Sequence, residues 1–298
     1  MTFVTVTAAL LLALGDGAAP AKPSDPGSGP PAASAPAKAP AAATLLRRMC
    51  DRIQAAKTFT VRGQLSLELP VTDATTATFF NQYDTAVRRP DGLSAHRVGD
   101  LPDFRLVYDG KSMTLLVPGK MKWATTSAPP TIDAMLPVAD EKGGLNMPFD
   151  ELLVADPCAA ITAGITEIVV TTPAIIKGKK VEHLVLTGPQ LRIEYWIDPA
   201  TALPARSLVV YLDDPQRPHF QVEFAEWKID PKLPASTFAL PKPKGATQVD
   251  FREAASEFHS WARKCASATS SSQACSPAWP FPAPARQSSS SVVALPPS

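Results

Sequence analysis

The stretch FTVRGQLSLEL, residues 59–69, decides the fold class of this chain. Apolar residues and one glycine alternate there with Thr, Arg, Gln, Ser and Glu, and this period of two is the pattern of a β-strand with one dry and one wet face. Similar segments follow at short spacing, with turn residues such as Asp109-Gly110 between them. Strands spaced this closely predict an antiparallel meander rather than alternating strand and helix units.

The predicted strands form two groups, and a helical insertion lies between the groups. The first group comprises residues 59–69, 77–88, 92–98, 104–108, 112–117 and 121–125. The second group comprises residues 166–171, 181–187, 191–197, 205–212 and 220–229. Short helices are predicted in the insertion over residues 132–136, 149–153 and 158–161, and Pro148 and Pro157 suit helix starts.

Two further helices flank the strands. Thr44 can cap an amphipathic helix whose apolar side is Leu45, Leu46, Met49, Ile53 and Ala56. A second amphipathic helix is predicted over residues 252–265. The fold class is therefore α+β, mainly β: a strongly curved antiparallel sheet of about ten strands, a half-barrel, because a sheet that large has to curl or split. We expect the N-terminal helix and the central insertion to cover its concave face.

The ends of the chain differ in composition from residues 44–251. Residues 1–21 hold an apolar run of signal-peptide length followed by small residues, although no basic residue precedes it. The run is too short to span a bilayer. Residues 22–43, rich in Pro and Ala, and residues 266–298, rich in Ser and Pro, are predicted to be a disordered linker and tail. We therefore expect an exported, periplasmic protein without a transmembrane span.

The charge balance and the spacing of the cysteines argue against some classes of function. The chain has 29 Lys and Arg against 28 Asp and Glu, a balance that does not favour binding to nucleic acid. Its four cysteines, Cys50, Cys158, Cys265 and Cys275, form no Cys-x-x-Cys pair. Export would permit disulfides, and four cysteines allow three connectivities, among which the sequence leaves the choice open.

Several short motifs follow one another in an order typical of a known family. They are Arg89-Pro90-Asp91, Tyr108-Asp109-Gly110-Lys111, Pro148 with Asp150-Glu151-Leu152-Leu153, His183-Leu184, Tyr195-Trp196-Ile197, Leu203-Pro204 with Arg206, and Trp227 before Phe238. Over residues 44–251 this order resembles the predicted periplasmic family named domain of unknown function 2092, which is similar to the LolA and LolB superfamily. The resemblance implies a half-barrel whose helices cover an apolar hollow, which in characterised relatives receives the acyl chains of lipoproteins. It implies no catalytic or ligand-contact residue for this chain.

The sequence offers little support for an enzyme. Its four histidines are isolated, and no nucleophile elbow, dinucleotide fingerprint or phosphate loop is present. The acidic pairs Asp140-Glu141 and Asp213-Asp214 lie in turn-like segments, where carboxylates are usually solvated. We expect no catalytic site, no bound metal and no cofactor.

Apolar side chains on the predicted strands are the candidate binding residues. Those expected to line a cavity are Phe59, Val61, Leu65, Leu67, Leu106, Tyr108, Leu115, Trp123 and Trp196. Ordinary core packing is the alternative interpretation of the same residues. Two functions stay open: a monomeric periplasmic carrier for an acyl chain, lipid or lipoprotein, and an envelope sensor or scaffold whose packed half-barrel binds a protein partner.

Overall fold

The computed structural model describes residues 39–72, 75–145 and 147–257. The predicted signal peptide, most of the predicted linker, residues 258–265 of the last predicted helix and the predicted tail lie outside this part of the chain. The described residues include the whole of the predicted half-barrel except residues 73, 74 and 146.

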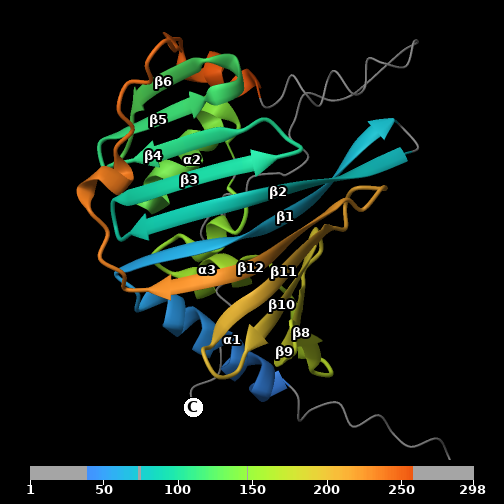
Figure 1. Ribbon diagram of the computed structural model, residues 1–298. Helices are drawn as coiled ribbons and strands as arrows, with labels where there is room; N and C mark the ends of the chain where they lie inside the picture. The colour runs from blue at the N-terminus through green and yellow to red at the C-terminus, as the bar shows by residue number, and fades with distance from the viewer. Residues whose placement is uncertain (1–38, 73–74, 146, 258–298) are drawn as a thin grey trace, which may run out of the picture. The chain divides into compact units, whose positions relative to one another are not determined.

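A single sheet of 13 strands forms the scaffold (Figure 1). The strands before the helical insertion are β1 (Thr58–Thr72), β2 (Thr75–Arg88), β3 (Gly92–Gly99), β4 (Phe104–Tyr108), β5 (Ser112–Val117) and β6 (Lys122–Ser127). Those after it are β7 (Glu167–Val170), β8 (Ala174–Ile176), β9 (Lys179–Thr187), β10 (Leu191–Asp198), β11 (Leu203–Tyr211), β12 (His219–Ile229) and β13 (Thr247–Gln248).

The spatial order of the strands joins the two groups at β1. The order is β13-β6-β5-β4-β3-β2-β1-β12-β11-β10-β9-β7, and β8 also pairs with β9. Neighbours are antiparallel except for β13 and β6, which pair in parallel. The sheet does not close on itself, so its concave face has to be covered by other elements.

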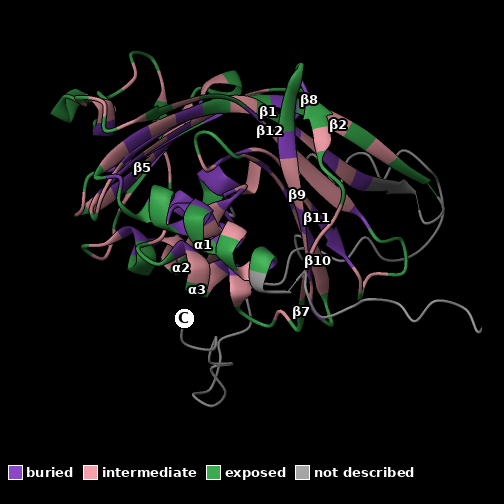
Figure 2. Cartoon of the chain, turned by 90° about the horizontal axis from the view of Figure 1, so that it is seen from below, coloured by how far each residue is buried: buried purple, intermediate pink, exposed green. Residues whose placement is uncertain are grey.

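Helices and the segment between α2 and α3 provide that cover, and short 3-10 turns complete the list of helical elements. The helices are α1 (Ala39–Gln54), α2 (Ile132–Gly143) and α3 (Pro157–Thr162), and residues 251–257 are also helical. The 3-10 turns are η1 (Pro118–Lys120), η2 (Asp150–Leu152) and η3 (Ala235–Phe238). Seen from below, the sheet arches over α1, α2 and α3, and the buried residues lie between the two layers (Figure 2). The predicted mainly β half-barrel is thus confirmed.

The helices differ from the prediction at their ends. The sequence predicts a start after Thr44, but α1 begins at Ala39, because alanine favours helix and Ala42 is fully buried in the core. The sequence also predicts that the insertion's first helix stops before Pro137. The helix α2 instead continues through Pro137 to Gly143, where Gly144 adopts the left-handed conformation and caps it.

The two strands that the sequence does not predict are short and lie near the edges of the sheet. The three-residue strand β8 pairs with the start of β9, and the two-residue strand β13 pairs with β6. Neither is long enough to show a period of two, which explains why alternation does not reveal them.

Candidate functional site

A small cavity lies on the concave face between β1–β4 and the chain that leads from α2 to α3. Its volume is about 30 Å³, enough for ordered water but far too small for an acyl chain. Its lining residues are Leu65, Tyr83, Thr85, Ala95, His96, Arg97, Phe104, Met147, Pro148, Phe149 and Leu153. Residues 147–153 therefore fill most of the space that a ligand on this face would need.

Tyr83 lies on β2 directly opposite Gly63 of β1. The register of β1 against β12 shifts between Arg62 and Gly63, and a Cβ atom at position 63 would lie 1.9 Å from the carbonyl oxygen of Glu223 and 2.6 Å from the Tyr83 hydroxyl. Only glycine fits this close approach. The Tyr83 side chain is 5% exposed, and within the described residues its hydroxyl has no hydrogen-bond partner. Burial raises the pKa of this hydroxyl.

Phe149 covers the cavity from the opposite side. Its ring is buried between Tyr83, at a centroid distance of 5.0 Å, and Phe224 on β12, at 5.6 Å. Its backbone φ is 56°, in the left-handed region that bulky residues rarely adopt. The packing of the Phe149 ring therefore stabilises a left-handed backbone conformation that is unfavourable by itself.

Arg97 on β3 is the cross-strand neighbour of Tyr83. Its guanidinium lies 4.8 Å from the centroid of the Phe104 ring and donates a hydrogen bond to the carbonyl of Pro102 at 3.0 Å. Burial lowers the pKa of Arg97 to about 10, and the nearby Asp103 carboxylate opposes that shift. The side chain thus stays a cation at neutral pH, with its guanidinium over Phe104.

A buried acid pair follows Phe149 in the 3-10 turn η2. The hydroxyl of Tyr195 on β10 donates to Oε1 of Glu151 at 2.6 Å, and the carboxyl groups of Asp150 and Glu151 are hydrogen-bonded to each other. Burial raises the pKa of both groups, that of Asp150 to about 7, and the negative charge of Glu151 adds to the shift of Asp150. The two carboxyl groups therefore hold η2 against β10 most strongly when one of them is protonated.

Arg89, at the end of β2, fixes the chain that follows η2. Its guanidinium donates to the carbonyl of Leu153 at 2.7 Å, to that of Leu152 at 3.1 Å and to that of Val154. It also lies 5.6 Å from the centroid of the Phe59 ring. The motif that begins at Arg89 and the motif that begins at Asp150 are therefore in contact, which gives both a structural role.

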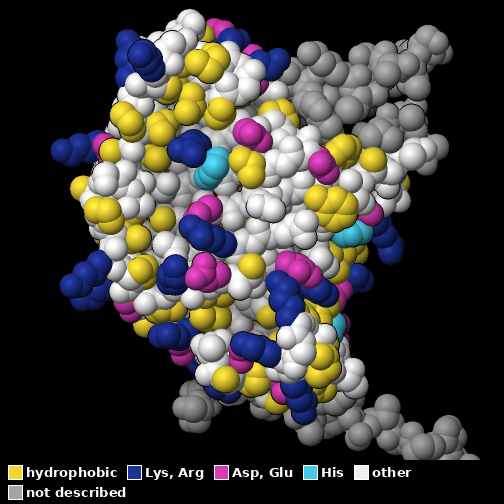
Figure 3. All heavy atoms as spheres, viewed as in Figure 1, with side chains coloured by type: hydrophobic (Ala, Val, Ile, Leu, Met, Phe, Trp, Pro, Cys, Tyr) yellow, Lys and Arg dark blue, Asp and Glu magenta, His cyan; other side chains and the backbone are white. Residues whose placement is uncertain are grey.

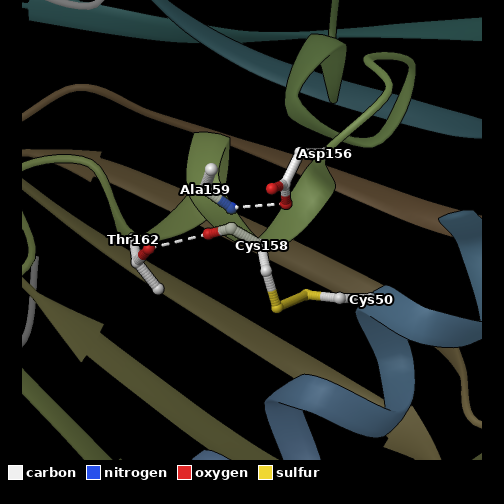
Figure 4. Close-up of a disulfide and its surroundings, with 5 residues drawn as sticks. All are labelled: Cys50, Asp156, Cys158, Ala159 and Thr162. Carbon is white, nitrogen blue, oxygen red and sulfur yellow. Dashed lines mark hydrogen bonds between the residues drawn. A yellow bond between two sulfur atoms is a disulfide. The ribbon is translucent and has the colours of Figure 1, made fainter. Parts of the chain in front are cut away.

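A disulfide between Cys50 and Cys158 joins α1 to α3 (Figure 4). The two Cα atoms are 5.4 Å apart. The carboxylate of Asp156 caps α3 by accepting a hydrogen bond from the Ala159 amide at 2.9 Å, and the Thr162 hydroxyl donates to the Cys158 carbonyl at 2.7 Å. This bridge is one of the pairings that the sequence leaves open, while Cys265 and Cys275 lie outside the described residues.

Most of the predicted cavity residues lie on the concave face. Those buried in the main core are Phe59, Val61, Leu65, Leu106, Tyr108 and Leu115, and of these Leu65 lines the cavity. Leu67 belongs to a separate small cluster with Leu69 and Leu101. The Tyr108 hydroxyl donates to the carbonyl of Pro129. Their role in ligand binding stays a prediction.

The two predicted tryptophans lie on the other face of the sheet, which corrects the prediction that they line the interior. On β10, Ile193, Tyr195 and Ile197 are buried, so Trp196 points outward and stacks on His183 at 4.3 Å between ring centroids. On β6, Ala124 faces the core and Trp123 does not. Figure 3 shows this outer face, where acidic and basic side chains are mixed with hydrophobic ones.

Tyr83 and Arg97 are residues that the sequence does not single out, whereas Asp150 and Glu151 are named only as part of a motif and without a role. Alternation over residues 77–88 would have placed Tyr83 on the same face as Thr85 and Val87, which are buried. No local pattern could have placed Arg97 beside Tyr83, because that contact depends on the register between two strands.

Two negative findings apply to the described part of the chain. Its helices do not combine the length and the apolarity that crossing a membrane requires. In the same residues, His, Cys, Asp and Glu side chains form no group of three or more that could hold a metal ion.

Several solved structures are similar to this chain at low identity. The MucA/MucB complex of Pseudomonas aeruginosa matches with 12% identity and a TM-score of 0.38, covering 67% of this chain and 61% of that one, so the match spans about three fifths of its length. Lipoprotein LppX of Mycobacterium tuberculosis matches with 13% identity and a TM-score of 0.39, covering 63% and 95%. A LolA superfamily protein of Nitrosomonas europaea matches with 10% identity and a TM-score of 0.32, covering 67% and 97%.

The comparison with sequence families gives a firmer result. A search of curated proteins found no match. Residues 42–252, which include nearly all of the described domain, match the family described as predicted periplasmic protein, DUF2092. The match begins within α1 and ends within the last described helix, so it includes the sheet, its covering helices and the cavity. The chain therefore belongs to the DUF2092 family of predicted periplasmic proteins.

Proposed function

We propose that this protein is a periplasmic, non-enzymatic carrier or binding protein for an apolar ligand, an acyl chain, a lipid or a lipoprotein, held between the curved sheet and its covering helices. The observation that carries the proposal is the apolar concave face of an unclosed sheet, covered by helices and by residues 147–153. Burial of apolar ligand surface, at about 25 cal/mol per Å² before the costs of association, would supply the affinity.

Ligand binding requires that the covering layer moves. The cavity of about 30 Å³ cannot hold an acyl chain, so residues 147–153 have to leave the sheet first. The left-handed Phe149 supports this step, because release of its ring would relieve a disfavoured backbone conformation. The ligand would then replace the apolar contacts that Phe149 makes now.

Export to the periplasm is part of the same proposal. The apolar run in residues 1–21 and the Cys50–Cys158 disulfide both support it, since disulfides persist in oxidising compartments. We propose that the apolar run acts as a signal peptide and is removed.

Native mass spectrometry of the full chain, purified from the periplasm of the expression host, tests the proposal. We expect adducts of lipid mass that disappear under denaturing conditions, or uptake of palmitate added to the unloaded protein. A protein that is unloaded as purified and takes up neither palmitate nor a diacyl lipid would overturn the carrier proposal.

The small size of the cavity favours a second candidate, the envelope scaffold with a packed half-barrel. In that case the covering helices stay in place, and the outer surface binds a protein partner. Affinity purification from envelope extract separates the candidates: a carrier copurifies with lipid or lipoprotein, and a scaffold copurifies with one protein in constant ratio and without lipid.

A further inference from the structure

The hairpin of β8 and β9 exposes an apolar side chain close to its turn. Ile175 on β8 is 69% exposed, more than any other large hydrophobic side chain in the described residues. A turn of two residues joins the strands, and both of them, Lys177 and Gly178, have positive φ values, 49° and 75°. Turns of this kind connect two strands tightly, so the backbone fixes the direction in which Ile175 points.

The two faces of this hairpin differ in burial. Ile176 on β8 and Val181 on β9 share one face and are 8% and 1% exposed, although neither belongs to the main core. Ile175 is paired with Lys180 in the register of the strands, and both are exposed on the opposite face. The hairpin therefore packs with one face and presents the other face to solvent.

The buried face of the hairpin lies against the outer side of the sheet. The ammonium group of Lys177 lies 3.8 Å from a carboxylate oxygen of Glu223 on β12. Glu223 points outward, because its neighbours Val222 and Phe224 are buried in the core. Seen from below, β8 stands at the top of the arch, away from α1, α2 and α3 (Figure 2). The exposed face of the hairpin thus points away from both the sheet and its covering layer.

Three lysines follow Ile175 within the hairpin. Lys177, Lys179 and Lys180 are all exposed, and in the described part of the chain neither Lys179 nor Lys180 belongs to a salt bridge. Glu182 is the only acidic residue in β8, β9 and the turn between them. Ile175 and the three lysines form the hairpin tip, a positively charged surface that includes one aliphatic side chain.

The chemistry of the hairpin tip fits an anionic membrane surface better than a protein. Anionic headgroups attract lysine side chains near a bilayer, and an aliphatic side chain is stabilised when it enters the region beneath the headgroups. A stable protein interface needs about 800 Å² on each partner, and its core is depleted in lysine. A strand of three residues and its turn offer far less area than that.

We propose that the hairpin tip docks the protein on membranes that contain anionic phospholipids. Ile175 enters the headgroup layer, and the three lysines lie against the phosphates. The inference goes beyond the proposed function and does not depend on it, because docking requires no opening of the covering layer. Each lysine at such a surface strengthens binding about fivefold, so the contact is reversible and sensitive to salt.

Sedimentation of the chain, purified from the periplasm of the expression host, with lipid vesicles tests the inference. In about 0.05 M salt, we expect vesicles of phosphatidylglycerol and phosphatidylcholine in equal parts to bind at least about tenfold more tightly than vesicles of phosphatidylcholine alone. About 0.5 M salt should remove the difference, because it screens the charges of the lysines. Equal binding to the two kinds of vesicle in low salt, or no binding to either, would overturn the inference.

Variants separate docking through the hairpin tip from an effect of net charge. Lys179→Gln with Lys180→Gln should weaken binding to the anionic vesicles more than about tenfold. Ile175→Ser should weaken it about fivefold without a change of charge. The matched control is Lys232→Gln with Lys242→Gln, which removes two exposed lysines from the segment between β12 and β13, away from β8 (Figure 1). The control should bind like the wild type. An equal loss in the control, or unchanged binding in either tip variant, would overturn the inference and leave the proposed function standing.

Discussion

The covering layer has two halves that are attached to the sheet in different ways. On the β7–β11 side, α1 contacts the strands and is joined to α3 by the disulfide. On the β6 side, α2 and residues 251–257 bury side chains such as Met135 and Phe251 in the same core, but their further ties to the sheet are polar: Lys142 donates to the Thr126 hydroxyl at 2.8 Å, and Lys122 pairs with Glu257 at 2.8 Å. The cavity lies between the halves, where the chain that joins α2 to α3 crosses the sheet. We therefore expect the cover to open by movement of the α2 half.

The largest effect should come from the disulfide. A Cys50→Ala and Cys158→Ala double variant should lose about 4 kcal/mol of unfolding free energy, because the bridge closes a long loop of the unfolded chain. Urea denaturation of this variant, and of the wild type with and without reductant, measures the loss. If the double variant is as stable as the oxidised wild type, then the half of the covering layer that contains the disulfide is not the more firmly attached half.

Arg89 tests how the joining chain is fixed between the halves. Arg89→Met leaves the buried carbonyls of Leu152 and Leu153 without their donor, so we expect a loss of about 3 kcal/mol in urea denaturation. Arg62→Met is the control, because Arg62 pairs with Asp84 in solvent and should contribute less than about 1 kcal/mol. Equal losses in the two variants would contradict the role given to Arg89.

The acid pair makes the joining chain sensitive to pH. The pKa of Asp150 is about 7 in the folded state and near the ordinary 3.8 in the unfolded chain, so the folded state keeps a proton that the unfolded state releases. This contribution is fully present below about pH 4 and is lost as the pH rises through about 7; between pH 5 and pH 8 the loss is about 3 kcal/mol. Denaturation midpoints at about pH 5 and pH 8 should differ in the wild type and much less in Asp150→Asn. If the midpoints differ as much in Asp150→Asn as in the wild type, then other titratable groups cause the pH dependence.

The smallest effect should come from the polar attachment of α2. Lys142→Met removes hydrogen bonds to the Thr126 hydroxyl and the Ser127 carbonyl and should cost about 1 kcal/mol. Hydrogen exchange should increase in α2 and stay unchanged in α1 if the halves open separately. Increased exchange in both helices would show that the covering layer moves as one body.

Much of the fold could be predicted because alternation is a local property of the strands. The period of two over residues 59–69 identifies β1 and its dry face, and Phe59, Val61 and Leu65 are buried as that pattern requires. The same rule, applied to Ile193 and Ile197, would have turned Trp196 outward. The position of a residue in the alternation along the strand predicts its face of the sheet better than its own hydrophobicity does.

The candidate site could not be predicted in the same way. Tyr83 meets Arg97 through strand register, and Phe149 reaches Tyr83 only because the insertion folds back over the sheet. The partner of Cys50 is likewise set by the packing of α1 on α3. These contacts join residues far apart in sequence, and neither composition nor periodicity encodes them.

The position of β1 in the sheet also has consequences for how the molecule assembles. Its residues Phe59–Leu67 pair with Phe220–Ile229 of β12, near the other end of the domain. A chain synthesised from its N-terminus leaves one hydrogen-bonding edge of β1 unpaired until β12 has been made. Because such distant pairing slows folding, this open edge can pair with other chains during that interval.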